Sequence, residues 1–362
     1  MTNHPAARTM FDRLGMRVPI IQAPMAGVST PAMAAAVARE GGLGSLGVGA
    51  MRAQLARAEI HRFRELGGGA LNVNVFVHRP ARADVEKEAA WIGRLQPEFA
   101  RCGAGPPEHL REIYTSFLED DAMLALLAEE KPAAASFHFG VPHPRQVRAL
   151  HDAGIFLMAT ATSVREAQAI EAAGLDAIVA QGYGAGGHRG MFDPEADDDK
   201  FGTFALVRLL ATTCVLPVIA AGGIMDGAGI AAALALGAAA VQLGTAFVGS
   251  DESLADEGYR ARLFGDPARH TTMTRAISGR PARCLANDFT RWGASLADDL
   301  VPDYPIAYDV GKALHAAGKR AGFDGYGAQW AGQGAPLARR LSSQALMQAL
   351  ETEWREASAT PV

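Results

Sequence analysis

The sequence has few cysteines, no long hydrophobic run and no cluster of like charges. Its 362 residues include three cysteines, Cys102, Cys214 and Cys284, which are too scattered for a disulfide framework or a CxxC metal site. We therefore expect a reducing, cytoplasmic environment. No apolar run reaches the roughly 18 residues that a membrane span needs, and the first residues do not resemble a secretory signal. The sequence thus predicts no membrane partner.

Charge and motifs exclude further classes of protein. Thirty-four basic and 39 acidic residues give a formal net charge of −5, and the arginines form no tract, so we expect no nucleic-acid partner. The sequence lacks a GxSxG elbow, a Walker A loop and an HExxH motif. The acidic stretch 193–199 is interpreted as a solvated loop, and no metal site is predicted.

Short runs rich in Val, Ile and Leu alternate with Ala-rich segments of helical period from residue 18 onward. This alternation is typical of repeated βα units around a parallel sheet. The eight runs are 19–23, 43–48, 71–77, 134–139, 155–160, 177–181, 217–221 and 239–244. Eight such units favour a TIM-like (β/α)8 barrel over an open sheet.

The spacing of the runs also divides the chain. We expect residues 1–250 to form the barrel, with a helical excursion at about 79–131, after the third strand. Residues 251–362 are predicted to be a smaller, mainly helical segment that packs at the barrel mouth. This segment contains five notable aromatic residues, interpreted either as a wall of a binding site or as the core of the segment: Trp292, Tyr304, Tyr308, Tyr326 and Trp330.

Glycines follow the seventh and eighth runs, where barrels commonly hold a phosphate. Gly222 and Gly223 directly follow the seventh run. The eighth run ends at Gly244, and Thr245 follows it. Glycine allows backbone N–H groups to approach phosphate oxygens closely. The helix expected from Asp226 onward would present its positive end to the anion. We therefore predict a phosphate site that needs no lysine.

Two histidines are expected at the same mouth. The sixth run continues into a glycine-rich loop, 181–190, that contains His188, and the fourth run ends at His138. An imidazole can exchange a proton near neutral pH, as a general base must. Each histidine also has a structural interpretation, as a loop or a core residue. In the third run, Asn72 and Asn74 share one face, and if that face points into the barrel, Asn74 is placed to hydrogen-bond the edge of a heterocycle. The alternative interpretation is that both are buried amides satisfied by their neighbours.

Several separated segments resemble the nitronate monooxygenases, formerly 2-nitropropane dioxygenases, of class I type. The resemblance is carried by residues 19–25, 136–140, 181–190, 220–227, 303–312 and 330–336. It implies an FMN enzyme that oxidises alkyl nitronates, above all propionate 3-nitronate, with O2 to a carbonyl compound and nitrite. A nitronate and O2 would then be its small-molecule partners. The sequence leaves open whether the protein is a monomer or a dimer.

The resemblance also implies roles for individual residues. His188 matches the catalytic base and His138 a second active-site histidine. Tyr304, Tyr308 and Lys312 match residues of the substrate pocket, and their spacing of four places them on one helical face. The positions that match flavin-binding residues are Pro24, Met25, Asn74, Gln181, Gly186, Gly187, Gly222, Gly223, Gln242, Gly244 and Thr245. Gly184 departs from the family pattern, which has Glu there.

Two other functions are compatible with the same motifs. One is an NAD(P)H-dependent FMN reductase of a quinone or an enoyl thioester, because such barrels share the phosphate loops. The other is a barrel that binds flavin without catalysis. The segments around His138 and His188 favour the monooxygenase over both.

Overall fold

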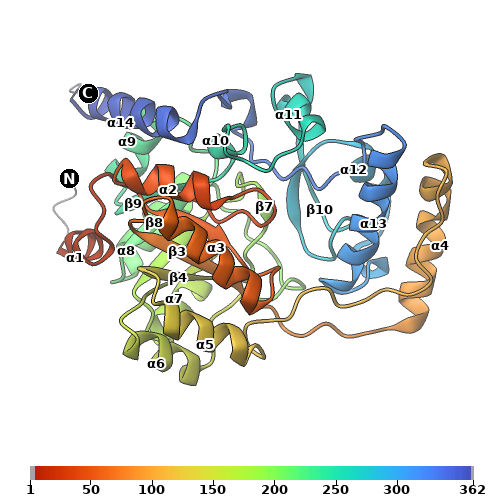
Figure 1. The fold of residues 1–362 in the computed structure, drawn as a ribbon, viewed down its shortest axis with the longest axis horizontal. Helices are drawn as coiled ribbons and strands as arrows, with labels where there is room; N and C mark the ends of the chain where they lie inside the picture. The colour runs from red at the N-terminus through yellow and green to blue at the C-terminus, as the bar shows by residue number, and fades with distance from the viewer. Residues whose placement is uncertain (1–4, 360–362) are drawn as a thin grey trace.

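A computed structural model describes residues 5–359 and contains the predicted barrel (Figure 1). Eight parallel strands lie in the order β1-β9-β8-β6-β5-β4-β3-β2, and each of the eight predicted runs overlaps one of them. The strands are β1 (Ile20–Gln22), β2 (Gly44–Gly47), β3 (Leu71–Phe76), β4 (Ala134–His138), β5 (Phe156–Ala161), β6 (Ala177–Gln181), β8 (Val218–Ala221) and β9 (Ala240–Leu243). The (β/α)8 prediction is therefore confirmed.

The barrel closes between its first two strands. Ile21 bridges to Leu43 in parallel register, and the Gln22 amide donates to the Leu43 carbonyl at 3.0 Å. Helix α1 (Pro5–Leu14) covers the opposite end from the mouth, because its buried Met10 and Leu14 belong to the same apolar cluster as residues of the strands. Side chains fill the interior on that side, so a ligand site can form only near the carboxyl ends of the strands.

A ring of helices surrounds the strands: α2 (Pro31–Arg39), α3 (Ala53–Glu65), α5 (Asp121–Glu130), α6 (Pro144–Asp152), α7 (Val164–Ala172), α8 (Thr203–Thr213), α9 (Gly227–Ala235) and the short α10 (Thr245–Val248). The last helix, α14 (Ser343–Ala359), packs against α9 and α2. Its Leu346, Met347 and Leu350 are part of the apolar core shared with the barrel. Part of segment 251–362 thus lies on the side of the barrel and not at its mouth.

The rest of the C-terminal segment gathers on one side of the barrel, with α4 (Val85–Arg101) on its outer flank (Figure 1). It comprises α11 (Glu257–Leu263), η1 (Asp266–Arg269), β10 (Thr271–Thr274), β11 (Ala282–Leu285), α12 (Asp288–Gly293), η2 (Asp298–Leu300), α13 (Ile306–Arg320) and η3 (Ala335–Leu337). Strands β10 and β11 form an antiparallel sheet with β7 (Gly187–His188). This sheet joins the loop after β6 to the C-terminal segment.

Helix α4 is the part of the predicted excursion that leaves the barrel. Asp84 caps its first turn, since its carboxylate accepts a hydrogen bond from the Lys87 amide. Its apolar face, with Trp91 and Phe99, joins one buried cluster with Leu314 of α13. The other helix of the excursion, α5, packs in the barrel ring against α3 and α6. Among the described residues, no helix is long and apolar enough to cross a membrane.

Candidate active site

A cavity of about 560 Å³ lies at the carboxyl ends of the barrel strands and extends to the C-terminal segment. Its size is typical of a site for a small molecule or a cofactor. Every residue predicted for the site lines it: Pro24, Met25, Asn74, His138, Gln181, Gly186, Gly187, His188, Gly222, Gly223, Gln242, Gly244, Thr245, Tyr304, Tyr308 and Lys312. The structure therefore brings the whole predicted set together.

The glycine turns after β8 and β9 form one end of this cavity. Gly222 and Gly223 have φ values of +118° and +74°, a backbone region that favours glycine. The N–H groups of Gly222, Gly223, Gly244 and Thr245 donate to no atom of residues 5–359. Converging backbone N–H groups without protein acceptors are suited to bind the oxygens of a phosphate.

The helix that follows β8 does not contribute as predicted. The Asp226 carboxylate accepts a hydrogen bond from the Gly229 amide at 2.8 Å, and Glu353 of α14 accepts one from the Gly227 amide at 3.0 Å. Arg339 in turn pairs with Glu353 at 2.6 Å. The start of α9 is therefore capped by two carboxylates, and the prediction that it presents its positive end to an anion is wrong.

Amide side chains offer acceptors further along the cavity. Gln242 Oε1 is buried and has no hydrogen-bond partner among the described residues. The Asn74 amide group donates to the Ser136 carbonyl at 3.0 Å and to its hydroxyl at 2.9 Å, and Asn74 Oδ1 accepts from none of the described residues. A buried acceptor without a partner is costly, so both oxygens fit a ligand that carries N–H or O–H donors.

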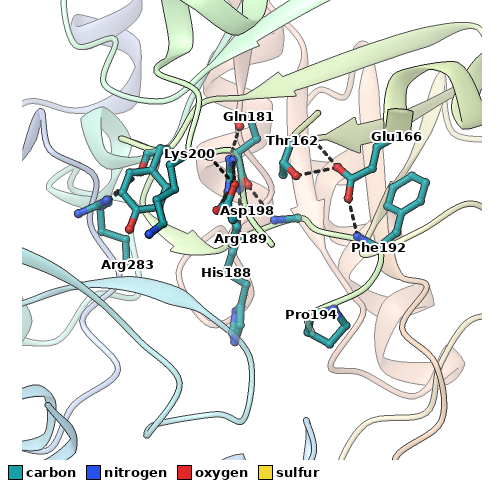
Figure 2. Close-up of polar contacts among 12 residues, drawn as sticks. Thr162, Glu166, Gln181, His188, Arg189, Phe192, Pro194, Asp198, Lys200 and Arg283 are labelled. Atoms are coloured by element: carbon teal, nitrogen blue, oxygen red, sulfur yellow. Dashed lines mark hydrogen bonds and ion pairs between the residues drawn. The ribbon is translucent and has the colours of Figure 1, made fainter. Parts of the chain in front are cut away.

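Gln181 and Arg189 hold the loop after β6 in place (Figure 2). Gln181 Nε2 donates to the His188 carbonyl at 2.9 Å, and Gln181 Oε1 accepts from the Gly190 amide at 2.8 Å. Arg189 makes two hydrogen bonds to Asp198, each of 2.8 Å. The Gln181 side chain is thus engaged within the loop, and its predicted contact with a flavin stays a prediction.

The acidic stretch 193–199 is largely exposed, as expected of a solvated loop, and three of its carboxylates also form ion pairs. In addition to Asp198, Asp193 pairs with Arg79 at 2.6 Å, and Glu195 pairs with Arg275 at 2.7 Å. These ion pairs fasten the loop to the segment after β3 and to the C-terminal segment.

The His188 side chain points away from the Arg189 guanidinium (Figure 2). Its Nε2 lies 2.9 Å from the Ser278 hydroxyl, which lies 3.3 Å from the Arg280 carbonyl. Because a carbonyl only accepts, the hydroxyl donates to Arg280 and accepts from His188 Nε2–H. Nδ1 then carries the lone pair, and it makes no hydrogen bond within the described chain. Burial, the largest effect, together with the neighbouring His138, lowers the pKa of His188 to about 3.

His138 is engaged at both ring nitrogens. Its Nε2 lies 3.1 Å from the His188 carbonyl and therefore donates to it, and its Nδ1 accepts from the Thr160 hydroxyl at 3.0 Å. Burial lowers the pKa of His138 to about 4. This imidazole is consequently neutral and has no free lone pair, so it is suited to position the backbone of His188 and not to remove a proton.

An aromatic wall faces His188 from the C-terminal segment. The rings of Trp330, Tyr304 and Tyr308 lie 5.0, 5.4 and 6.0 Å from the His188 ring. The Tyr304 hydroxyl is buried without a partner among the described residues. The sequence alone leaves open whether five aromatic residues form a wall of the binding site or the core of the C-terminal segment. These three form the wall. Trp292 and Tyr326 instead pack in the apolar cluster of α4 and α13.

Lys312 lies at the outer part of this wall. Its side chain is exposed, and Nζ lies 5.0 Å from the Tyr114 ring and 5.3 Å from the Tyr308 ring. Tyr308 and Lys312 both lie on α13, whereas Tyr304 precedes the helix by two residues. Among the described residues that line the cavity, Lys312 is the one lysine or arginine. It is therefore the permanent cation that a ligand meets at the mouth.

Contacts with residues 331–334 explain two glycines of the loop. A Cβ atom on Gly186 would lie 2.4 Å from the Gly332 nitrogen, so the close approach of two backbones requires glycine there. A Cβ atom on Gly184 would lie 2.8 Å from Gln333 Oε1, at the end of an exposed and flexible side chain. A side chain at position 184 would therefore displace only the end of the Gln333 side chain.

Sequence reasoning missed Tyr114, Ser278 and Tyr259. Tyr114 and Tyr259 line the cavity, and Ser278 binds His188. Tyr114 belongs to an irregular stretch between α4 and α5, and Ser278 to the turn between β10 and β11. Neither stretch has a periodic pattern or a motif, so no local signal in the sequence indicates Tyr114 or Ser278, whereas Tyr259 lies on helix α11.

Comparisons with known proteins agree with this arrangement. The family model described as nitronate monooxygenase matches residues 8–353. A nitronate monooxygenase of Paraburkholderia phytofirmans is 60% identical over 356 residues, which cover 98% of this chain and 97% of that protein. One of Pseudomonas aeruginosa is 54% identical and covers 96% of this chain and all of its own length.

A solved structure extends the likeness to the fold. The crystal structure of nitroalkane oxidase from Streptomyces ansochromogenes superposes with a TM-score of 0.87 at 40% sequence identity, covering 96% of this chain and 98% of that one. The family match over nearly the whole chain, the two close relatives and the complete cavity lead to one conclusion: the chain belongs to the nitronate monooxygenase family and is an oxidoreductase.

Proposed function

We propose that this protein uses FMN to oxidise alkyl nitronates, with propionate 3-nitronate as its substrate and O2 as the oxidant, to a carbonyl compound and nitrite. The observation that carries the proposal is that two histidines line the cavity and neither has a carboxylate partner among the described residues, which favours their neutral state. The pKa of His188 is lowered to about 3 and that of His138 to about 4. Such groups are weak bases, which favours a substrate that arrives already deprotonated. A nitronate is such a substrate.

The cavity has groups that fit FMN. The free N–H groups of Gly222, Gly223, Gly244 and Thr245 would hold its phosphate. The oxygens of Gln242 and Asn74 would accept hydrogen bonds from its hydroxyl and ring N–H groups, and Pro24 and Met25 would lie along the ring. When bound, FMN supplies redox chemistry, because it takes electrons from the substrate and passes them to oxygen.

Residues of the aromatic wall would bind the nitronate itself. Lys312 at the cavity mouth attracts the anion, and the Tyr304 hydroxyl, which lacks a partner in the described chain, can donate to a nitronate oxygen. Trp330, whose ring lies 5.0 Å from that of His188, lines the pocket beside the imidazole and would limit the entry of water. His188, held through Ser278, presents its free Nδ1 as an acceptor.

Anaerobic mixing tests this proposal against its alternatives. The purified protein is mixed with propionate 3-nitronate and, separately, with NADH and NADPH, and the flavin absorbance is followed. We expect rapid bleaching by the nitronate alone and release of FMN on denaturation. Rapid bleaching by NADPH and not by the nitronate would instead identify a reductase. No bleaching by any of the three would indicate a flavin-binding protein without this activity.

A further inference from the structure

An arginine is buried behind the substrate pocket without an acidic partner. Arg280 is 4% exposed, and no carboxylate of residues 5–359 lies within 4.0 Å of its guanidinium. Its Nη2 donates to the Met191 carbonyl, and its Nε has no acceptor among the described residues. Burial lowers the pKa of Arg280 to about 10, so the side chain is still charged at neutral pH. The fold therefore keeps a permanent positive charge inside the protein.

One aromatic ring separates this charge from the substrate pocket. The Arg280 guanidinium carbon lies 4.2 Å from the centre of the Phe139 ring. The same ring lies 5.4 Å from Tyr304 and 5.7 Å from His188, which both line the cavity. Phe139 has a φ of +78°, which is an uncommon backbone conformation for a bulky residue. Its ring lies between Arg280 on one side and Tyr304 and His188 on the other.

The groups around Arg280 do not cancel its charge. His78, His138 and His188 are neutral at pH 7, because burial lowers each pKa to about 4 or below, and Arg280 lowers all three further. Burial also keeps the Tyr304 hydroxyl protonated by raising its pKa. The charged groups that act on Arg280 at longer range are Arg79, Arg275 and Glu166. Arg79 and Arg275 are themselves paired with Asp193 and Glu195, and Glu166 lies beyond ion-pair distance, so no group in contact with Arg280 neutralises its charge.

We propose that Arg280 determines specificity: its buried charge behind Phe139 makes the pocket prefer an anionic substrate to a neutral one of the same shape. The inference rests on the proposed function for the identity of the anion. In a medium of low effective dielectric constant, a unit charge acts over such a distance without touching the ligand. Lys312 attracts the anion at the exposed mouth, and Arg280 acts on it inside the pocket.

The stability of the fold gives an independent reason to assign Arg280 a role in substrate binding. A buried cation without a counterion is unfavourable, and the cation–π contact with Phe139 and the bond to Met191 offset only part of that cost. Met at this position would fill similar space without the charge. We therefore expect R280M to unfold at a temperature equal to or above that of the wild type. A residue with a purely structural role would behave in the opposite way.

The test compares R280M and R280Q with R280K, in the FMN-loaded protein. Glutamine retains a donor for the Met191 carbonyl, and lysine retains the charge. Ethyl nitronate and nitroethane differ by one proton and serve as matched substrates. Sodium nitrite serves as a probe of anion binding, followed through the flavin absorbance without turnover. Thermal unfolding is measured for each variant.

We expect R280M and R280Q to raise the KM of ethyl nitronate and the Kd of nitrite about tenfold, with the KM of nitroethane nearly unchanged. R280K should restore most of both values. Equal effects on nitronate and nitroethane, an unchanged nitrite Kd, or an R280K variant as weak as R280M would overturn the proposal. If the wild type binds nitrite but does not oxidise ethyl nitronate, the proposed function fails, whereas the nitrite comparison still decides the role of Arg280.

Discussion

Replacement of His188 by Asn tests how the site handles protons. A neutral nitroalkane must lose its α-proton before it can be oxidised, whereas a nitronate has already lost it. In the structure, His188 donates through Nε2 to Ser278, so Nδ1 is the atom that would accept the proton. Asn has similar polarity but no basic nitrogen. The variant should therefore impair turnover of the nitroalkane more than turnover of the nitronate.

The size of the loss follows from the pKa of His188. A well-tuned base contributes about 10²–10⁴-fold to a proton transfer. Burial lowers the pKa of His188 from 6.5 to about 3. With a Brønsted coefficient of about 0.5, that shift weakens the base by roughly 50-fold. We therefore expect H188N to reduce nitroalkane turnover only about tenfold, near the lower end of what a base could contribute.

Steady-state oxygen uptake with nitroethane and with ethyl nitronate, at equal flavin content, measures both effects on one preparation. S278A is the matched control, because it leaves the imidazole in place and removes the hydroxyl that orients it. A loss of 10³-fold or more with nitroethane alone would refute the reasoning, since His188 would then act as a full-strength base. Equal loss with both substrates would assign His188 to binding.

Three further variants address other parts of the site. Gly223→Leu should lower the ratio of flavin to protein, because its side chain would enter the phosphate end of the cavity; Gly154→Leu, with a similar φ of +82° and open space around it, controls for backbone strain. Lys312→Met should raise the KM of ethyl nitronate far more than that of nitroethane. Equal effects on both KM values would show that Lys312 is a surface charge with no role in binding the anion. His78 is neutral in the fold, with its pKa lowered from 6.5 to about 4, so the unfolded state takes up the proton first as the pH falls and stability decreases below about pH 6.5. Urea unfolding should show that H78L loses about 2 kcal/mol less stability than the wild type between about pH 7 and pH 5, and a parallel loss would contradict this.

The barrel is predictable from sequence because each of its strands is marked locally. A strand buried on both faces reads as a short apolar run, as in residues 177–181, and the intervening helices have their own period. Strands β10 and β11 lack this mark. The sequence Thr271–Thr274 is polar and only partly buried, and it pairs with β11, which in turn pairs with β7, a two-residue strand in a distant loop. No window of the sequence contains that information.

The site residues were predictable to the extent that they follow barrel strands. Asn74, His138 and Gln242 occupy the carboxyl ends of β3, β4 and β9, where topology alone brings them to one mouth. Tyr114 and Ser278 do not follow barrel strands, and they reach the site through packing of the C-terminal segment. Their contribution could be recognised only from the folded chain.

The error at helix α9 shows how a distant residue can change the meaning of a local motif. The glycines before Asp226 indicate a phosphate turn, and a helix follows, so its positive end seemed available. The carboxylate of Glu353, 126 residues after Gly227 in the chain, accepts a hydrogen bond from the Gly227 amide at the start of that helix, and Arg339 holds the carboxylate there. An additional anion at this helix would be repelled by both carboxylates. Under the proposed function, the phosphate of FMN would therefore bind to the loop amides of Gly223 and Gly244 and not to the start of α9, and Gly223→Leu tests this placement.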